Sequence, residues 1–86
     1  MAEDTVTIRY FARLREELDT DGESVPCAGA RTAGDLLAQL ASRGGPWQQL
    51  VEGQPVMIAV NQAMARPETP VQPGDEVAFF PPVTGG

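Results

Sequence analysis

The residues best suited to chemistry lie at the end of the chain, where Gly85 and Gly86 follow the proline-stiffened run Phe79–Thr84. Glycine has no side chain, so these two residues can enter a channel too narrow for any other residue. The two prolines of the run cannot continue a sheet ladder and favour an extended conformation. From Phe80 to Gly86 an extended tail reaches roughly 20 Å, at about 3.3 Å per residue. We therefore expect a tail that presents its terminal carboxylate to the active site of another protein.

The composition indicates a small acidic domain with a protein partner. The chain has 86 residues, of which 12 are acidic and 6 are basic, and its net charge is −6. A chain of this length forms one domain with a single core. Its negative charge disfavours nucleic acids and anionic membranes, so we expect neither as a partner. An electropositive protein surface is the better complement.

The residue types that are missing limit the chemistry of the chain itself. It has no histidine, which is the usual base near neutral pH, and no lysine for Schiff-base chemistry. Cys27 is the single cysteine, which excludes an internal disulfide and a Cys–His metal site. We predict no metal site. No segment resembles a signal peptide or reaches the length of a membrane span, so a cytoplasmic protein is expected.

Hydrophobic periodicity predicts strands near both ends of the chain and one principal helix between them. Residues 5–10 alternate apolar and polar side chains, as a half-buried strand does. Thr32 begins the clearest helix, because Asp35 stands at the capping-box position and apolar residues recur at helical spacing through Leu40. The other predicted elements are a short helix over 11–18, a helical turn over 46–51, strands over 23–28, 56–60, 63–65 and 76–80, and a loop over 66–74.

This order of elements, with two strands before the main helix and the remaining strands after it, predicts an α+β fold. Pairing the first and last strands side by side, in the centre of the sheet and under the helix, buries the most apolar surface. That arrangement is the β-grasp, or ubiquitin-like, fold: a mixed sheet with one main helix packed on it and a protruding C-terminal tail. We assign residues 1–80 to the β-grasp domain and residues 81–86 to the extended Gly-Gly tail.

The stretch Pro73–Gly86 resembles the C-terminus of the molybdopterin synthase small subunit family very closely. Ile8–Ala12, followed by Leu14–Glu16, is similar to the first strand and following turn of that family. Ala59–Gln62 is similar to its third strand. The resemblance covers nearly the whole chain, although residues 19–45 match only in pattern.

The resemblance implies a covalent sulfur carrier. A ubiquitin-activating-type enzyme would adenylate the Gly86 carboxylate with ATP, and a sulfur donor would convert the acyl-adenylate into a thiocarboxylate. The tail would then enter the large subunit of molybdopterin synthase, where the sulfur attacks cyclic pyranopterin monophosphate. Catalytic groups are expected on the large subunit, in keeping with the lack of histidine and lysine here. The chain itself would bind no cofactor, and the family habit is a two-plus-two heterotetramer.

Several side chains near the tail are candidates for partner contacts. Strand alternation places one of Phe79 and Phe80 toward the core and the other outward. We expect Phe80 to be the outward one, in an exposed apolar patch with Phe11; the alternative is that Phe80, Phe11 and Tyr10 all belong to the core. Tyr10 is expected in the core. By its place in the family motif, Arg15 would pair with an acidic group of a partner or steady the tail, unless it is a solvated helix charge. The predicted partner-binding residues are Phe11, Arg15, Phe80, Pro81, Pro82, Val83, Thr84 and Gly85.

Other noticeable residues have simple structural interpretations. Cys27 is predicted to be a small buried hydrophobe. Trp47, with Leu50 and Val51, is predicted to cover the core, and Met57 and Met64 are predicted to pack. The acidic residues of the first 23 positions read as a solubilising surface, because no pocket surrounds a pair of them.

Three other functions fit the same residues. One is a related sulfur carrier that serves thiamine, cysteine or tRNA thiolation. Another is a ubiquitin-like modifier that forms isopeptide bonds with other proteins. The third is a β-grasp interaction module whose tail has no chemical role.

Overall fold

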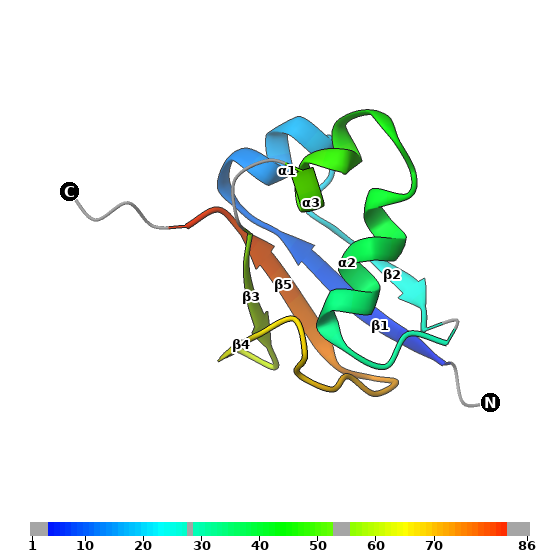
Figure 1. Ribbon diagram of the computed structural model, residues 1–86. Coiled ribbons are helices and arrows are strands. Elements are labelled where there is room, and N and C mark those ends of the chain that lie inside the picture. Colours follow the sequence, from blue (N-terminus) through cyan, green and yellow to red (C-terminus); the bar gives the residue numbers. More distant parts are fainter. Residues whose placement is uncertain (1–3, 28, 53–55, 83–86) are drawn as a thin grey trace.

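Nine short elements make up the part of the chain that the computed structural model describes, residues 4–27, 29–52 and 56–82 (Figure 1). In chain order they are β1 (Thr5–Tyr10), α1 (Ala12–Leu18), β2 (Gly22–Pro26), α2 (Ala33–Ala41), the 3-10 helix η1 (Gly45–Gln48), α3 (Gln49–Glu52), β3 (Met57–Val60), β4 (Ala63–Ala65) and β5 (Glu76–Phe80).

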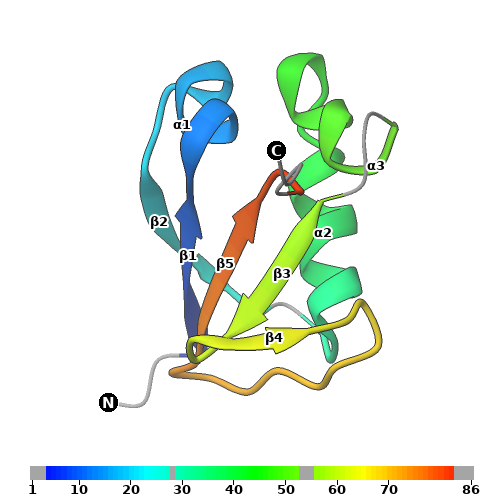
Figure 2. The ribbon, with the colours of Figure 1, turned by 90° about the vertical axis from the view of Figure 1, so that its left-hand side faces the viewer.

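The strands form one mixed sheet in the order β2-β1-β5-β3-β4 (Figures 1 and 2). β1 and β5 are parallel neighbours in the middle of the sheet, and the other neighbouring pairs are antiparallel. The predicted β-grasp arrangement, with the first and last strands side by side in the centre, is thus confirmed. The apolar strand β3 lies within the sheet between β5 and β4, as its composition predicts.

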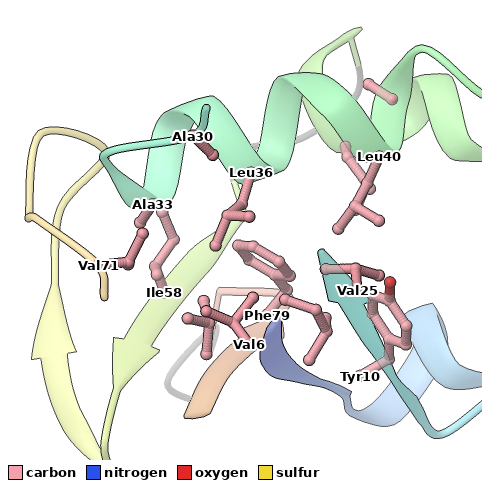
Figure 3. Packing of buried hydrophobic residues seen from close by; sticks show 14 of the residues in the cluster. Val6, Tyr10, Val25, Ala30, Ala33, Leu36, Leu40, Ile58, Val71 and Phe79 are labelled. Atoms are coloured by element: carbon pink, nitrogen blue, oxygen red, sulfur yellow. The ribbon is translucent and has the colours of Figure 1, made fainter. Parts of the chain in front are cut away.

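Helix α2 covers one face of this sheet (Figure 1). It begins with the predicted capping box, in which the Thr32 hydroxyl accepts from the Asp35 N–H and the Asp35 carboxylate accepts from the Thr32 N–H. Leu36 and Leu40 on its apolar stripe are buried. Figure 3 shows Leu36 pointing from the helix toward Phe79 in the sheet. The core therefore lies between α2 and the two central strands.

Helix α2 does not cover the opposite face of the sheet, which is called here the open face. Along β1, Ile8 and Tyr10 are buried whereas Arg9 between them is exposed. Along β5, Val77 and Phe79 are fully buried, and the alternate residues of that strand are only partly buried. Since strand side chains alternate between faces, the partly buried set points to the open face.

Two of the packing predictions are wrong. Met64 is 64 % exposed, because it lies directly across from Ala59 on β3 with its side chain outside the core. Val51 is 55 % exposed, because the short α3 helix buries only Leu50. Cys27 is buried, as predicted.

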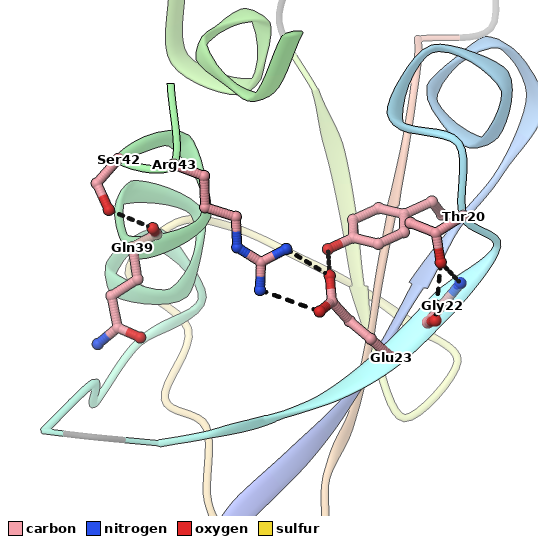
Figure 4. A network of polar contacts seen from close by, with 7 residues as sticks. Thr20, Gly22, Glu23, Gln39, Ser42 and Arg43 are labelled. Atoms are coloured by element: carbon pink, nitrogen blue, oxygen red, sulfur yellow. Dashed lines mark hydrogen bonds and ion pairs between the residues drawn. The ribbon is translucent and has the colours of Figure 1, made fainter. Parts of the chain in front are cut away.

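A polar and aromatic network ties the end of α2 to the two strands at the β2 edge of the sheet. Arg43 donates two hydrogen bonds to the Glu23 carboxylate, at 2.8 and 3.0 Å, and Figure 4 shows it reaching from beyond α2 to β2. The Tyr10 hydroxyl donates to the same carboxylate at 2.9 Å. The Arg43 guanidinium also lies over the Trp47 ring, 4.4 Å from its centroid. The network closes through an edge-to-face contact between Tyr10 and Trp47.

These contacts shift the pKa values of Glu23 and Tyr10. The bidentate bond from Arg43, supported by the Tyr10 hydroxyl, lowers the pKa of the Glu23 carboxyl. Burial, and then the bond to Glu23, raises the pKa of the Tyr10 phenol far above its usual value. Both groups therefore keep the protonation state that holds the network together at neutral pH.

Replacing Glu23 by glutamine tests the network. We expect Glu23→Gln to lower the free energy of unfolding by about 1–2 kcal/mol at neutral pH, because charge-assisted bonds are lost from a site still partly open to water. A lowered folded pKa means that the contribution of Glu23 is complete above the unfolded value, 4.5, and is lost as the pH falls through the folded value. The difference between wild type and variant in urea denaturation should therefore shrink below pH 4.5.

Glu17→Gln is the matched control, since it removes the same charge from the exposed Arg13–Glu17 pair on α1. It should change the free energy of unfolding by less than about 0.5 kcal/mol. Equal losses in the two variants, or a Glu23→Gln effect that persists in acid, would contradict this account.

Candidate partner-binding groove

The chain leaves the sheet at the segment Phe80–Pro82, called here the tail root. Phe80 is the last residue of β5 and lies opposite Met57 of β3. On the other side, the Phe11 N–H donates to the Phe79 carbonyl at 3.2 Å, so the start of α1 is held against the end of β5. Proline has no N–H and cannot extend either ladder, which ends the strand here.

A shallow groove of about 600 Å³ opens on the open face and ends at the tail root. Its floor follows from the register of the three inner strands, because Ala78 of β5 lies between Arg9 of β1 and Ala59 of β3. Two alanines side by side leave a hollow that larger side chains would fill. The groove is lined by Arg9, Phe11, Ala12, Ala59, Gln62, Glu76, Ala78, Phe80 and Pro81.

Arg9 and Glu76 are the two charged residues in this otherwise largely apolar lining. The Arg9 Nε lies 4.0 Å from a Glu76 carboxylate oxygen, and the two side chains are 52 % and 36 % exposed. This is a loose, solvated pair rather than a hydrogen-bonded one. Among the residues that the structure describes, no group of acidic or cysteine side chains is arranged to hold a metal ion.

Two lining residues adopt backbone conformations that are uncommon for residues with side chains. Ala12 has φ of 55° and Gln62 has φ of 70°, both in the left-handed region. Gln62 belongs to the turn between β3 and β4. Asn61 anchors that turn, because its side chain donates to Asp75 and accepts from the Glu76 N–H. Ala12 and Gln62, each with this left-handed backbone conformation, lie in the wall of the groove.

Comparisons with known proteins agree with this geometry. The sequence profile of the ThiS family matches residues 8–86. The chain belongs to the ThiS family. It is 38 % identical to the molybdopterin synthase sulfur carrier subunit of Escherichia coli, over 94 % of this chain and 99 % of that protein. The protein of the same name from Mycobacterium tuberculosis is 39 % identical, over 94 % and 96 %. The resemblance inferred from the tail motif is thus confirmed for this ThiS-family chain.

Solved structures share the fold. A putative molybdopterin converting factor subunit 1 from Pyrococcus furiosus superposes with a TM-score of 0.77 at 27 % identity, covering 92 % of this chain and 98 % of that one. SAMP1 from Haloferax volcanii gives 0.74 at 27 % identity, covering 95 % and 99 %. A chain of the BexX/CysO complex of Amycolatopsis orientalis gives 0.65 at 27 % identity, covering 94 % and 99 %.

The structure brings the predicted apolar residues together. Phe80 lies on the open face and Phe11, 45 % exposed, lies on the same groove, whereas Phe79 and Tyr10 are buried, as alternation predicts. Pro81 lines the end of the groove. The partner-binding role of these residues stays a prediction.

The tail beyond the root is a different case. Pro82 is half-buried at the root. Val83, Thr84, Gly85 and Gly86 lie outside the described residues, so the roles assigned to them stay predictions.

Arg15 does not join the groove. Its side chain is exposed on α1, and none of the ion pairs between described residues involves it. Its carbonyl accepts from the N–H groups of Asp19 and Thr20, which ends the helix. A contact between the Arg15 side chain and a partner stays a prediction, away from the groove.

Met64 is a candidate that the sequence interpretation missed. It lies across from Ala59, which lines the groove floor, and its exposed side chain extends the apolar surface toward β4. The usable signal was the two-residue turn between β3 and β4, because it sets the register and puts Met64 on the face of Ala59.

The adjacent phenylalanines of β5 offer a direct test of the two faces. Phe79→Ala should lower the free energy of unfolding by about 3–5 kcal/mol, because it empties a fully buried site in the core. Phe80→Ala removes the same atoms from a partly exposed site and should cost less than about 1.5 kcal/mol. Urea denaturation of both variants measures the difference. Similar losses would mean that the open face does not expose Phe80.

Proposed function

We propose that this chain is the sulfur carrier of a molybdopterin synthase. In this proposal the carboxylate of Gly86 is the chemically active group, and the groove on the open face is the surface that partners bind. The partners are an adenylating enzyme of the ubiquitin-activating type and the large synthase subunit. The names of the relatives from E. coli and M. tuberculosis support this assignment.

The proposed chemistry activates a poor electrophile. A terminal carboxylate, with a pKa near 3.5, is ionised at neutral pH and resists attack by sulfur. Adenylation by ATP forms a mixed anhydride at Gly86 and releases pyrophosphate. A sulfide equivalent from a sulfur donor then attacks the acyl carbon, the bond to AMP breaks, and a thiocarboxylate remains. That sulfur then forms a bond to cyclic pyranopterin monophosphate. Water breaks the bond between the sulfur and the acyl carbon of Gly86, which leaves the sulfur on the pterin and restores the carboxylate. Two such transfers complete the dithiolene.

The position of the groove is the observation that carries the proposal. The groove ends at Pro81, which is the residue where β5 becomes the tail. A protein that binds the groove therefore lies directly beside the point where the tail starts. In an extended conformation the chain from Phe80 to the Gly86 carboxylate would span roughly 20 Å, enough to reach an active site inside the partner. Binding of the partner at the groove would thus place the start of the tail where its Gly86 carboxylate can reach the active site of the partner.

The division of labour fits the composition. The chain has no histidine or lysine to act as acid, base or phosphate ligand, so the partners would supply these groups. ATP would be bound by the activating enzyme, and no cofactor by this chain. We place the carrier in the cytoplasm and in a two-plus-two assembly with the large subunit. None of the helices among the described residues is long and apolar enough to cross a membrane.

One alternative rests on a specific similarity. The fold matches a structure described as small archaeal modifier protein 1 of Haloferax volcanii, with a TM-score of 0.73 at 26 % identity. A modifier would use the same activated Gly86 but transfer the acyl group to an amine of another protein. The product distinguishes the two functions, because a carrier returns as free protein and a modifier becomes covalently attached.

The deciding experiment is the intact mass of the full chain after incubation with its activating enzyme, ATP and a sulfur donor. We expect a mass increase equal to the replacement of one oxygen by one sulfur, localised to Gly86. The increase should disappear when the large subunit and cyclic pyranopterin monophosphate are added.

A variant that lacks Gly86 is the control. It should unfold at the same urea concentration as the wild type and yet show no mass change. Wild-type chain that stays unmodified beside an active donor system would contradict the carrier function. Conjugates with other proteins in place of the thiocarboxylate would favour the modifier.

A further inference from the structure

The Arg9 guanidinium is the positively charged group in the lining of the groove. Among the described residues, its only ionic neighbour is Glu76, which approaches Nε at 4.0 Å, and its side chain makes no hydrogen bond. A guanidinium carries five N–H donors in a planar fork. In the free chain these donors are hydrated, because the side chain is 52 % exposed.

Binding of a partner over the groove would remove water from the Arg9 guanidinium. Arg9 lies beside Ala78 in the floor of the groove, with Phe11 and Phe80 also in the lining, so a partner that covers these apolar groups must also cover Arg9. Removing a charge from water without a new acceptor costs more than the apolar contacts around it gain. Glu76 alone does not solve this, since a 4.0 Å approach to one nitrogen leaves the outer N–H groups unpaired.

We propose that Arg9 is a specificity determinant that pairs with a carboxylate on the large synthase subunit. This inference rests on the proposed function. A carboxylate matches the planar fork and can accept two of its N–H groups at once. A partner surface that is apolar but lacks the carboxylate would be rejected, because it would bury Arg9 unpaired.

The large subunit is the better occupant than the activating enzyme. The relatives named above are subunits of the synthase, and an interface between subunits excludes water from its centre more fully than a brief encounter with an enzyme does. The carboxylate opposite Arg9 is therefore most needed there. The activating enzyme meets the chain only for one reaction, so its contact over the same groove can stay wetter and leave water on the Arg9 guanidinium.

Arg9→Leu tests the idea sharply, because leucine suits an apolar groove but cannot bind a carboxylate. The dissociation constant of the full chain for the large subunit should rise about 30-fold or more in Arg9→Leu, and further in Arg9→Glu. Arg66→Glu is the matched control: it makes the same charge change at an exposed site outside the groove and should shift binding less than about threefold. Calorimetry with purified partners measures these constants, and urea denaturation shows that each variant is folded.

Charge reversal identifies the partner group. One Asp→Arg or Glu→Arg change in the large subunit should restore binding to Arg9→Glu while weakening binding to the wild type. Failure of every such change would overturn the proposal.

The outcomes separate this inference from the proposed function. Wild-type chain that fails to bind the large subunit would argue against the carrier function itself. Wild-type binding with an equal or tighter Arg9→Leu would leave that function standing and overturn the role of Arg9. A loss confined to the activating enzyme would also overturn it, since the carboxylate would then belong to the other partner.

Discussion

The parallel pairing of β1 with β5 is the constraint on which the rest of the structure depends. It joins residues almost a chain length apart, with Thr7 beside Glu76 and Tyr10 beside Phe79. Parallel neighbours cannot be joined by a tight turn, so the intervening chain must cross over, and α2 does this on one face only. The same pairing carries the end of β5 to the start of α1. The tail root therefore lies beside the exposed Phe11 because the first and last strands are neighbours in the sheet.

The aromatic contacts show how the two faces are kept separate. On the covered face, Tyr10 stacks beside Phe79, with ring centroids 6.4 Å apart, and packs edge-on against Trp47. Its hydroxyl is satisfied by Glu23, so the core gains a large ring without an unpaired polar group. On the other face, Ala78 of β5 and Ala59 of β3 lie side by side and leave the hollow open. Strand β5 thus contributes both to a dense core and to a surface able to receive a partner.

Much of this arrangement follows from local patterns, and the remainder depends on register. Alternation is enough to predict that Phe79 and Phe80 face opposite sides of the sheet, and the capping box at Thr32 is visible in four residues. The exposure of Met64 depends on its pairing with Ala59, and the Arg43–Glu23 bond joins residues 20 positions apart. A single sequence does not state which distant side chains will meet across strands, because that depends on packing of the whole sheet. Local periodicity therefore predicts the elements better than the groove that they form.

The composition of the groove is itself a compromise imposed by its exposure. A broad apolar face on a free chain invites self-association, so a carrier that is sometimes without a partner must limit that face. Small alanines, a loosely paired Arg9 and Glu76, and a net charge of −6 all act in this direction. The same features limit the apolar area that docking can bury. In the proposed function the carrier leaves one partner for another, and a limited apolar area favours that exchange. Fast exchange depends on a high dissociation rate, and more hydrophobic burial would lower it.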